Sequence, residues 1–334
     1  MSCCGKSHNA RNLGRFCTSS GSGEPPRAHF MAILLLTWLF LVLAGLDLLV
    51  GDGISVPSGV ILWKLRVPRM LAAVVAGGSL ALAGAQMQAL LRNPLADPHI
   101  MGVSGGAGLG AAIAALAIGT SGVSMVSAAF AGALLTGLLI VWVSAHIHST
   151  GTLLLVGVML GFIFSAVSSV LQYHAGEESL KLLYSWMAGS FQGVGPGGVA
   201  VMAAAMAIGL GLAISSQKGL DLMLFGEEFA GTAGVPIRRL RLAVMIGCAL
   251  MTGAVTAYGG PLGFVGIAAP HIVRKAFGTS AHRTVLPLAP VTGACLALLA
   301  DIIAHLGTTP LPVGSTLALV GIPLVIILLW KNRL

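Results

Sequence analysis

Long apolar runs, separated by short polar breaks, recur along the whole chain. Ten such runs stand out: 30–50, 68–91, 99–118, 123–145, 152–174, 196–215, 237–258, 263–276, 284–306 and 314–330. A helix needs roughly 20 apolar residues to cross a bilayer, and only the eighth run is clearly short of that, so it is expected to cross in part. Strand-like alternation over about ten residues does not recur. The pattern predicts an all-α, polytopic membrane protein with about ten spans.

Composition agrees with a lipid-covered exterior. Hydrophobic residues make up 56% of the 334-residue chain and charged residues only 8%, whereas an ordinary soluble domain carries about 25% charged residues. The net charge of +8 follows from 18 basic and 10 acidic residues. The tendency of basic residues to remain on the cytoplasmic side explains this excess better than a nucleic-acid partner does.

The basic residues predict an orientation. With both termini in the cytoplasm and ten spans, 14 basic residues fall inside and four fall outside. The outer four are Lys64, Arg66, Arg69 and Lys181. We therefore expect a multi-pass protein of the inner membrane with both termini cytoplasmic.

Residues 1–29 form a polar tail, and residues 30–334 form the membrane domain. The tail contains Cys3, Cys4 and Cys17, whose spacing fits no strong zinc pattern. We predict no metal site there and a tail that is disordered. An alternative hypothesis is that translation begins at Met31, which opens the first apolar run. Cys248 and Cys295 lie in apolar runs and are expected to be buried.

A weak internal repeat links the second and seventh spans. Arg69, Gly78 and Gly84 have the same spacing as Arg238, Gly247 and Gly253. The first copy starts outside and the second inside, as in inverted-topology repeats of transporters. With so few matched positions, a chance match remains an open alternative.

No catalytic set or nucleotide-binding loop is found in the sequence. Gly5, Lys6 and Ser7 match the end of a phosphate-binding loop, but too few residues precede them for its first glycine. We expect a protein that is not an enzyme and holds no cofactor. Any ATP hydrolysis would belong to a partner chain.

The few charges at the outer ends of the spans are candidate functional groups. Arg66 and Arg69 open the second span. They either reach the interface as long side chains or dock acidic groups of a soluble partner. Asp301 and His305 lie one helical turn apart, near the outer end of their span where water is expected to be close. Local pairing or surface contact is favoured over a proton relay.

Three polar segments are also informative. The loop 92–98 is rich in turn residues, and Asp97 is placed to cap the next helix. Residues 176–191 predict a short amphipathic helix at the outer interface. The cytoplasmic segment 217–241 contains Glu227 and Glu228, which favour a helix N-terminus. Docking of a partner and simple connection remain equally possible for this segment.

Several motifs, in order, resemble those of one family. They are Arg66–Arg69, Asn93–Pro98 with Gly102–Gly105, Leu153–Gly157, Trp186–Gly189, Gly226–Glu228, Gly263–Gly266 with Pro270 and His271, and Leu311–Gly314. Over residues 55–333 the chain resembles the FecCD-type permeases of type II ATP-binding cassette (ABC) importers, which carry vitamin B12, iron siderophores or haem.

The resemblance implies a homodimer with one pathway, two cytoplasmic ABC ATPase subunits, a periplasmic substrate-binding protein and a metal-chelate cargo. It implies binding-protein docking at Arg66, Arg69 and the position of His305. The implied ATPase-coupling residues are Leu220, Phe225, Gly226, Glu227, Glu228, Ala230 and Gly234. The implied cytoplasmic gate comprises Ser149, Thr150, Gly151 and Thr152.

The chain departs from the family pattern at two outer positions. His305 stands where relatives often carry arginine, and Pro310 where many carry glutamate. For the cargo, residues 180–193 are similar to the vitamin B12 permeases, which favours cobalamin over siderophores and haem. The alternative function is an ion-coupled secondary transporter, which the inverted repeat and Asp301 would allow.

Overall fold

The computed structural model describes residues 26–51, 53–54, 59–118, 122–146, 150–307 and 309–330. The first described helix, α2, begins at Pro26, a few residues before the predicted start of the membrane domain. The cysteines of the polar tail and the rest of residues 1–25 lie outside the described part of the chain.

The described residues are almost entirely helical. The first half contains α2 (Pro26–Leu49), β1 (Val50–Gly51), β2 (Gly53–Ile54), α3 (Gly59–Ile61), η1 (Leu62–Arg66), α4 (Val67–Leu90), η2 (Pro98–Met101), α5 (Val103–Ile113), η3 (Ala114–Ile118) and α6 (Gly122–His146). The second half contains α7 (Thr150–Tyr173), α8 (Glu177–Ala188), α9 (Pro196–Met223), α10 (Glu227–Thr232), α11 (Ile237–Gly259), α12 (Val265–Phe277), α13 (His282–Ala304) and α14 (Val313–Trp330). β1 and β2 form a small antiparallel pair.

Each of the ten predicted spans coincides with a helix, which confirms the all-α polytopic fold. Seven helices are long and apolar enough to cross a membrane, within the part of the chain that the structure describes. α5 and α14 are shorter apolar helices. α12 has 13 residues, so at 1.5 Å per residue it extends only about 20 Å and matches the expected partial crossing. α9 extends to Met223, beyond the predicted end at residue 215.

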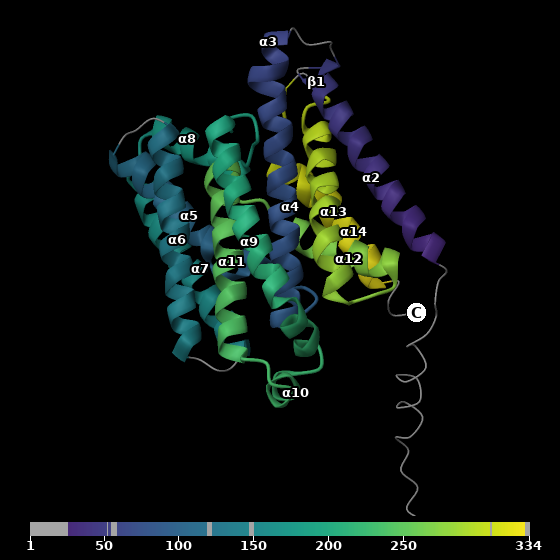
Figure 1. Ribbon diagram of the computed structural model, residues 1–334. Helices are drawn as coiled ribbons and strands as arrows, with labels where there is room; N and C mark the ends of the chain where they lie inside the picture. The colour runs from purple at the N-terminus through teal and green to yellow at the C-terminus, as the bar shows by residue number, and fades with distance from the viewer. Residues whose placement is uncertain are drawn as a thin grey trace, which may run out of the picture.

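The two ends of the helix bundle differ (Figure 1). α3, β1 and α8 lie at one end, and α10 projects from the other. We name these the outer end and the inner end, following the predicted orientation. α8 confirms the amphipathic helix predicted for residues 176–191. Its Trp186 Nε1 donates to the Ala257 carbonyl at 3.0 Å, while Tyr184 is exposed.

α4 is the central helix, packed against α9, α11, α12 and α13. Small residues permit this close packing. A Cβ atom at Gly77 would overlap the Gly293 carbonyl of α13, and one at Gly84 would overlap the Gly266 carbonyl of α12. In lipid, such close backbone approach replaces the hydrophobic effect as the main source of helix association.

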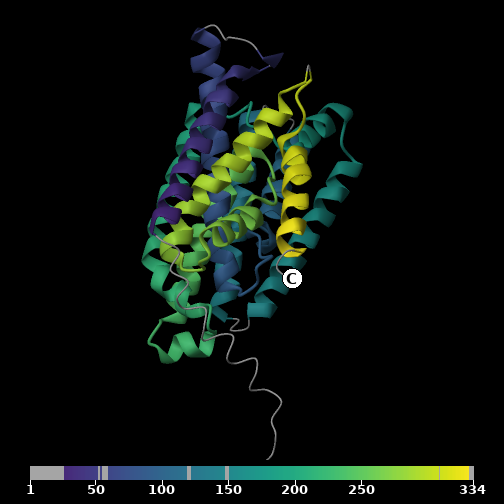
Figure 2. The same cartoon turned by 90° about the vertical axis from the view of Figure 1, so that its right-hand side faces the viewer.

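α2 and α7 lie at the periphery of the bundle, as the two perpendicular views show for α2 (Figures 1 and 2). Within the 18-residue apolar stretch of each helix, only 11% of the residues of α2 and 17% of those of α7 are buried. The corresponding share is 78% for the continuous helix Gly59–Leu90, which includes α4. The exposed side chains of α7 include Met159, Phe162 and Val170. These apolar faces must contact lipid or another protein chain.

Candidate functional site

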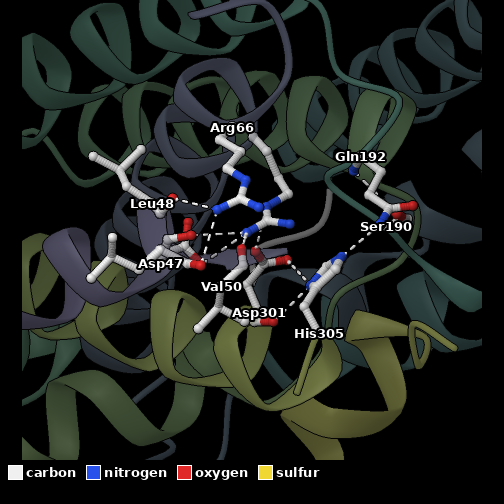
Figure 3. A network of polar contacts seen from close by, with 10 residues as sticks. Asp47, Leu48, Val50, Arg66, Ser190, Gln192, Asp301 and His305 are labelled. Atoms are coloured by element: carbon white, nitrogen blue, oxygen red, sulfur yellow. Dashed lines mark hydrogen bonds and ion pairs between the residues drawn. The ribbon is translucent and has the colours of Figure 1, made fainter. Parts of the chain in front are cut away.

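A group of polar residues meets at the outer end of the bundle (Figure 3). We call it the outer polar cluster. Its members are Asp47, Arg66, Arg69, Gln192, Asp301 and His305. They come from five elements: the end of α2, η1, α4, the segment between α8 and α9, and the end of α13. Five of the six are buried, and Gln192 is the exposed member.

Arg69 is the centre of the cluster. Its Nε lies 3.0 Å from Asp301 Oδ2, and its Nη2 lies 3.7 Å from Asp47 Oδ1. The same Nη2 donates to the carbonyls of Val50 at 2.6 Å and Asp47 at 3.0 Å. Two carboxylates and two carbonyl groups therefore surround one buried guanidinium. A buried charge needs such pairing because desolvation is costly.

The side chain of Arg66, the last residue of η1, lies against the end of α2 and against β1. Its Nη1 donates to the carbonyls of Leu48 at 2.9 Å and Leu49 at 3.0 Å. These carbonyl groups lie at the C-terminus of a helix, where the dipole favours a positive charge. Gly51 leaves room for the side chain, because a Cβ atom there would overlap the Arg66 guanidinium.

His305 connects the cluster to the segment that follows α8. Its Nδ1 lies 2.8 Å from the Asp301 carbonyl oxygen and 3.6 Å from Asp301 Oδ1. Its Nε2 lies 2.7 Å from Gln192 Nε2. Since an amide nitrogen only donates, this geometry requires Nε2 to accept and Nδ1 to carry the proton. Figure 3 shows Gln192 and His305 pointing toward each other.

The structure revises the expected surroundings of these residues. The local pairing of Asp301 with His305 is confirmed. The expectation that water is close to them is wrong, because the exposed fraction is 0% for Asp301 and 2% for His305. The alternative in which Arg66 and Arg69 extend to the interface is also wrong, because Arg66 is buried against carbonyl groups and Arg69 against carbonyl and carboxylate groups. Docking at these arginines stays a prediction.

Sequence reasoning missed Asp47 and Gln192. Asp47 is an acidic residue inside an apolar run, and the rule that selected Asp301 could have selected it too. Gln192 had no sequence signal. It also lines a cavity of about 830 Å³ between α6, α8 and α11, together with Trp186 and Tyr258.

The inner end presents α10, which lies in the segment predicted to meet a partner. α10 begins at Glu227, as predicted from its acidic first turn. Glu227 Oε1 lies 2.7 Å from Arg241 Nη2, which ties α10 to α11. The preceding Gly226 has φ 121°, a conformation that favours glycine.

The predicted coupling residues divide into exposed and buried groups. Phe225 has an exposed fraction of 76% and contacts the exposed Phe229, with ring centroids 5.7 Å apart. Phe229 was not among the predicted coupling residues. Leu220 of α9 and Ala230 of α10 are fully buried, so neither presents a surface to a partner. Gly234 follows α10 with φ 85°.

Two further polar contacts hold the inner end together. Asp221 Oδ1 at the end of α9 accepts from the His282 backbone N–H at 2.8 Å and lies 2.7 Å from its Nδ1. Gln88 of α4 accepts from Arg274 of α12 at 2.5 Å. These contacts join helices that lie far apart in the sequence, α9 to α13 and α4 to α12.

The remaining predicted site residues are at the start of α7. Thr150, Gly151 and Thr152 form its first residues, while Ser149 lies outside the described residues. Asp97, predicted as a cap, accepts from the His99 backbone N–H at 2.8 Å and caps η2.

Comparison with known proteins identifies the family. The sequence model of the FecCD transport family matches residues 29–331. The chain belongs to the FecCD transport family. The vitamin B12 import system permease protein BtuC of Vibrio cholerae is 39% identical over 311 residues, covering 90% of this chain and 93% of that protein. BtuC of Citrobacter koseri is 38% identical over 288 residues, covering 85% and 87%.

Solved structures agree with the FecCD assignment. A chain described as a metal-chelate type ABC transporter in an inward-facing conformation superposes with a TM-score of 0.82 and 30% identity, covering 89% of this chain and 98% of that one. The PsaBC structure from Streptococcus pneumoniae, with a TM-score of 0.55 and 18% identity, shares the fold alone. FecCD proteins are a transport family, which agrees with the prediction of a transport protein.

Proposed function

We propose that this FecCD chain is the permease subunit of an ABC importer that moves a metal chelate across the inner membrane. Residues 30–334 form the permease domain, and residues 1–29 form a polar tail. The observation that carries the proposal is the 39% identity to a vitamin B12 permease over most of both chains. Cobalamin is therefore the favoured cargo, ahead of iron siderophores and haem.

Two ABC ATPase subunits, which hydrolyse ATP, would bind at the inner end of a permease homodimer. The exposed rings of Phe225 and Phe229 on either side of the α10 N-terminus are suited to a groove in a soluble partner. The pair between Glu227 and Arg241 links α10 to α11. Movement of the ATPase would thus reach the membrane helices through that pair and through the buried Leu220 and Ala230.

A periplasmic substrate-binding protein would dock at the outer end. Arg66 and Arg69 are the proposed contacts, with His305 beside them. Because Arg69 is already paired with Asp47 and Asp301, a glutamate of the binding protein would have to compete with internal carboxylates. Docking would therefore rearrange the outer polar cluster and not simply add a contact to it.

The second permease copy would cover the exposed apolar faces of α7 and α14. Phe162 of α7 has an exposed fraction of 71% and Leu319 of α14 one of 72%. A pathway at the two-fold axis, with its cytoplasmic gate at Ser149–Thr152, would open alternately to the two sides. Docking of the loaded binding protein and closure of the ATPase dimer on ATP would drive this alternation. The permease itself would take part in no covalent chemistry.

Reconstitution tests the proposal. The permease in proteoliposomes should import cobalamin only with an ABC ATPase, ATP and a loaded binding protein. Arg66→Glu with Arg69→Glu should weaken binding-protein affinity, and Lys64→Glu with Lys181→Glu is the matched control at the same end. Import without the ATPase would contradict the function, and equal affinity of both double variants would exclude docking at the arginines.

An ion-coupled secondary transporter is the alternative function. The buried Asp47 and Asp301 favour it in principle, since intramembrane acids often carry protons. Arg69 lies within ion-pair distance of both, and a guanidinium keeps its charge and stabilises ionised carboxylates. Uptake that follows a proton gradient and persists after ATP removal would select this alternative.

A further inference from the structure

A pocket of about 380 Å³ opens at the inner end between α9 and α11. The end of α9 contributes Ser216 and Lys218, the start of α11 contributes Arg239, and the connection after α10 contributes Gly234 and Val235. Lys218 and Arg239 are exposed. The pocket therefore combines two flexible cations with a concave, partly polar wall.

The pocket favours an anion. Among the described residues that line it, none is acidic. The first turn of α11 contains Arg238 and Arg239 and no acidic residue. This arrangement opposes the helix dipole, whose positive end is stabilised by negative charge. Asp221 is paired with His282 and Glu227 with Arg241, while Glu228 of α10 is exposed to solvent and does not line the pocket. An anion in the pocket would offset the repulsion at the α11 N-terminus.

The pocket also continues into an apolar, exposed surface. α9 and α11 pack along each other (Figure 1). On α9, the exposed Ile208 lies two turns before Ser215 of the pocket. On α11, the exposed Ile246 lies two turns after Arg239. Residues seven apart share one face of a helix, so both faces run from the pocket toward the middle of the membrane.

We infer that this pocket binds the phosphate of an anionic phospholipid from the cytoplasmic leaflet. The phosphate lies between Lys218 and Arg239, and the acyl chains lie along the α9 and α11 faces that carry Ile208 and Ile246. Basic pockets between membrane helices on the cytoplasmic side suit acidic head groups. The inference rests on the proposed orientation but not on the identity of the cargo.

The bound lipid would contact the coupling region. Gly234 and Val235, which line the pocket, connect α10 to α11. The Val235 backbone N–H donates to the Ala230 carbonyl at 3.0 Å, so this connection folds back onto α10. The head group would thus stabilise the position of α10 on the bundle.

Native mass spectrometry of the full chain in detergent tests the site, with phosphatidylglycerol as the probe and phosphatidylcholine as the neutral comparison. We expect preferential retention of phosphatidylglycerol. Removing both charges in Lys218→Gln with Arg239→Gln should weaken its binding roughly 10- to 30-fold, since each basic residue near the surface contributes about 1 kcal/mol. The charge-preserving double variant Lys218→Arg with Arg239→Lys should bind phosphatidylglycerol about as well as the unaltered chain.

A matched control separates the site from general charge. Lys275 and Arg283 are also exposed basic residues at the inner end, outside the pocket lining. Lys275→Gln with Arg283→Gln should leave phosphatidylglycerol binding unchanged. Ala243→Phe fills the pocket without changing charge and should also weaken binding. Equal weakening by the two double glutamine variants would overturn the inference.

Two further arms distinguish other occupants. Millimolar inorganic phosphate should not displace the lipid, because it lacks acyl chains. Displacement by inorganic phosphate would mean that the pocket binds free anions, which overturns the lipid assignment. The measurement is repeated with the ATPase subunits bound, and retention of the lipid is expected. Loss of the lipid on assembly would assign the surface to the ATPase and overturn the inference, without affecting the proposed transport function.

Discussion

The buried pair between Arg69 and Asp301 gives the sharpest test of the outer polar cluster. Asp301→Asn keeps the size of the side chain and removes its charge. At the 3.0 Å contact, Coulomb's law with an effective dielectric constant of ~20 gives a gross attraction of about 5 kcal/mol. Desolvation offsets part of it, but breaking one partner of a buried pair typically costs about 3–5 kcal/mol.

We expect the lower end of that range. Arg69 keeps Asp47 at 3.7 Å and the carbonyls of Asp47 and Val50, which partly compensate its charge. Asp301→Asn should therefore lower the free energy of unfolding by about 3 kcal/mol. Unfolding is followed in mixed micelles as the fraction of denaturing detergent is raised.

The control is Asp97→Asn, the same chemical change at a capping position. Asparagine caps a helix about as well as aspartate, so we expect a change within about 0.5 kcal/mol. A cycle with Arg69→Met should also give a coupling energy above about 1 kcal/mol between positions 69 and 301. If Asp301→Asn is no more destabilising than Asp97→Asn, the buried pair does not stabilise the fold and the reasoning fails.

Three other predictions concern packing and coupling. Gly84→Val should lower the free energy of unfolding by more than about 3 kcal/mol in the same assay, because the valine side chain would overlap the α12 backbone. The control Gly211→Ala has open space around it and should change the free energy of unfolding little. Gly226→Ala should cost about 1–3 kcal/mol, because its φ of 121° strains any other residue. Glu227→Gln should weaken the ion pair with Arg241 and reduce the cargo transported per ATP hydrolysed in proteoliposomes. An unchanged ratio of cargo to ATP would mean that this ion pair does not transmit the movement of the ATPase.

The helices were predictable because crossing a membrane is a local property of the sequence. Each apolar run carries its own signal, independent of its neighbours. The same holds for α8, whose amphipathic pattern predicts an interfacial helix, and for Glu227 at the start of α10. Boundaries were less predictable: α9 extends to Met223 because its last turns pack on α10 and α11, beyond the hydrophobic run.

The outer polar cluster was only partly predictable. Arg66, Arg69, Asp301 and His305 were selected because charged residues are rare in this chain. Their surroundings were not, because burial depends on which helices pack together. Asp47 meets Arg69 across a separation of 22 residues, and Gln192 meets His305 across 113. No local pattern encodes those distances.

The sequence by itself determined the membrane class, the positions of the spans and the family. These follow from hydrophobicity and from motifs that are read locally. The tertiary structure alone decided that Arg69 is enclosed by carboxylates and carbonyls, and that Lys218 and Arg239 share a pocket. The physical reason is that a charge acts on what surrounds it, and those surroundings are created only when distant helices pack.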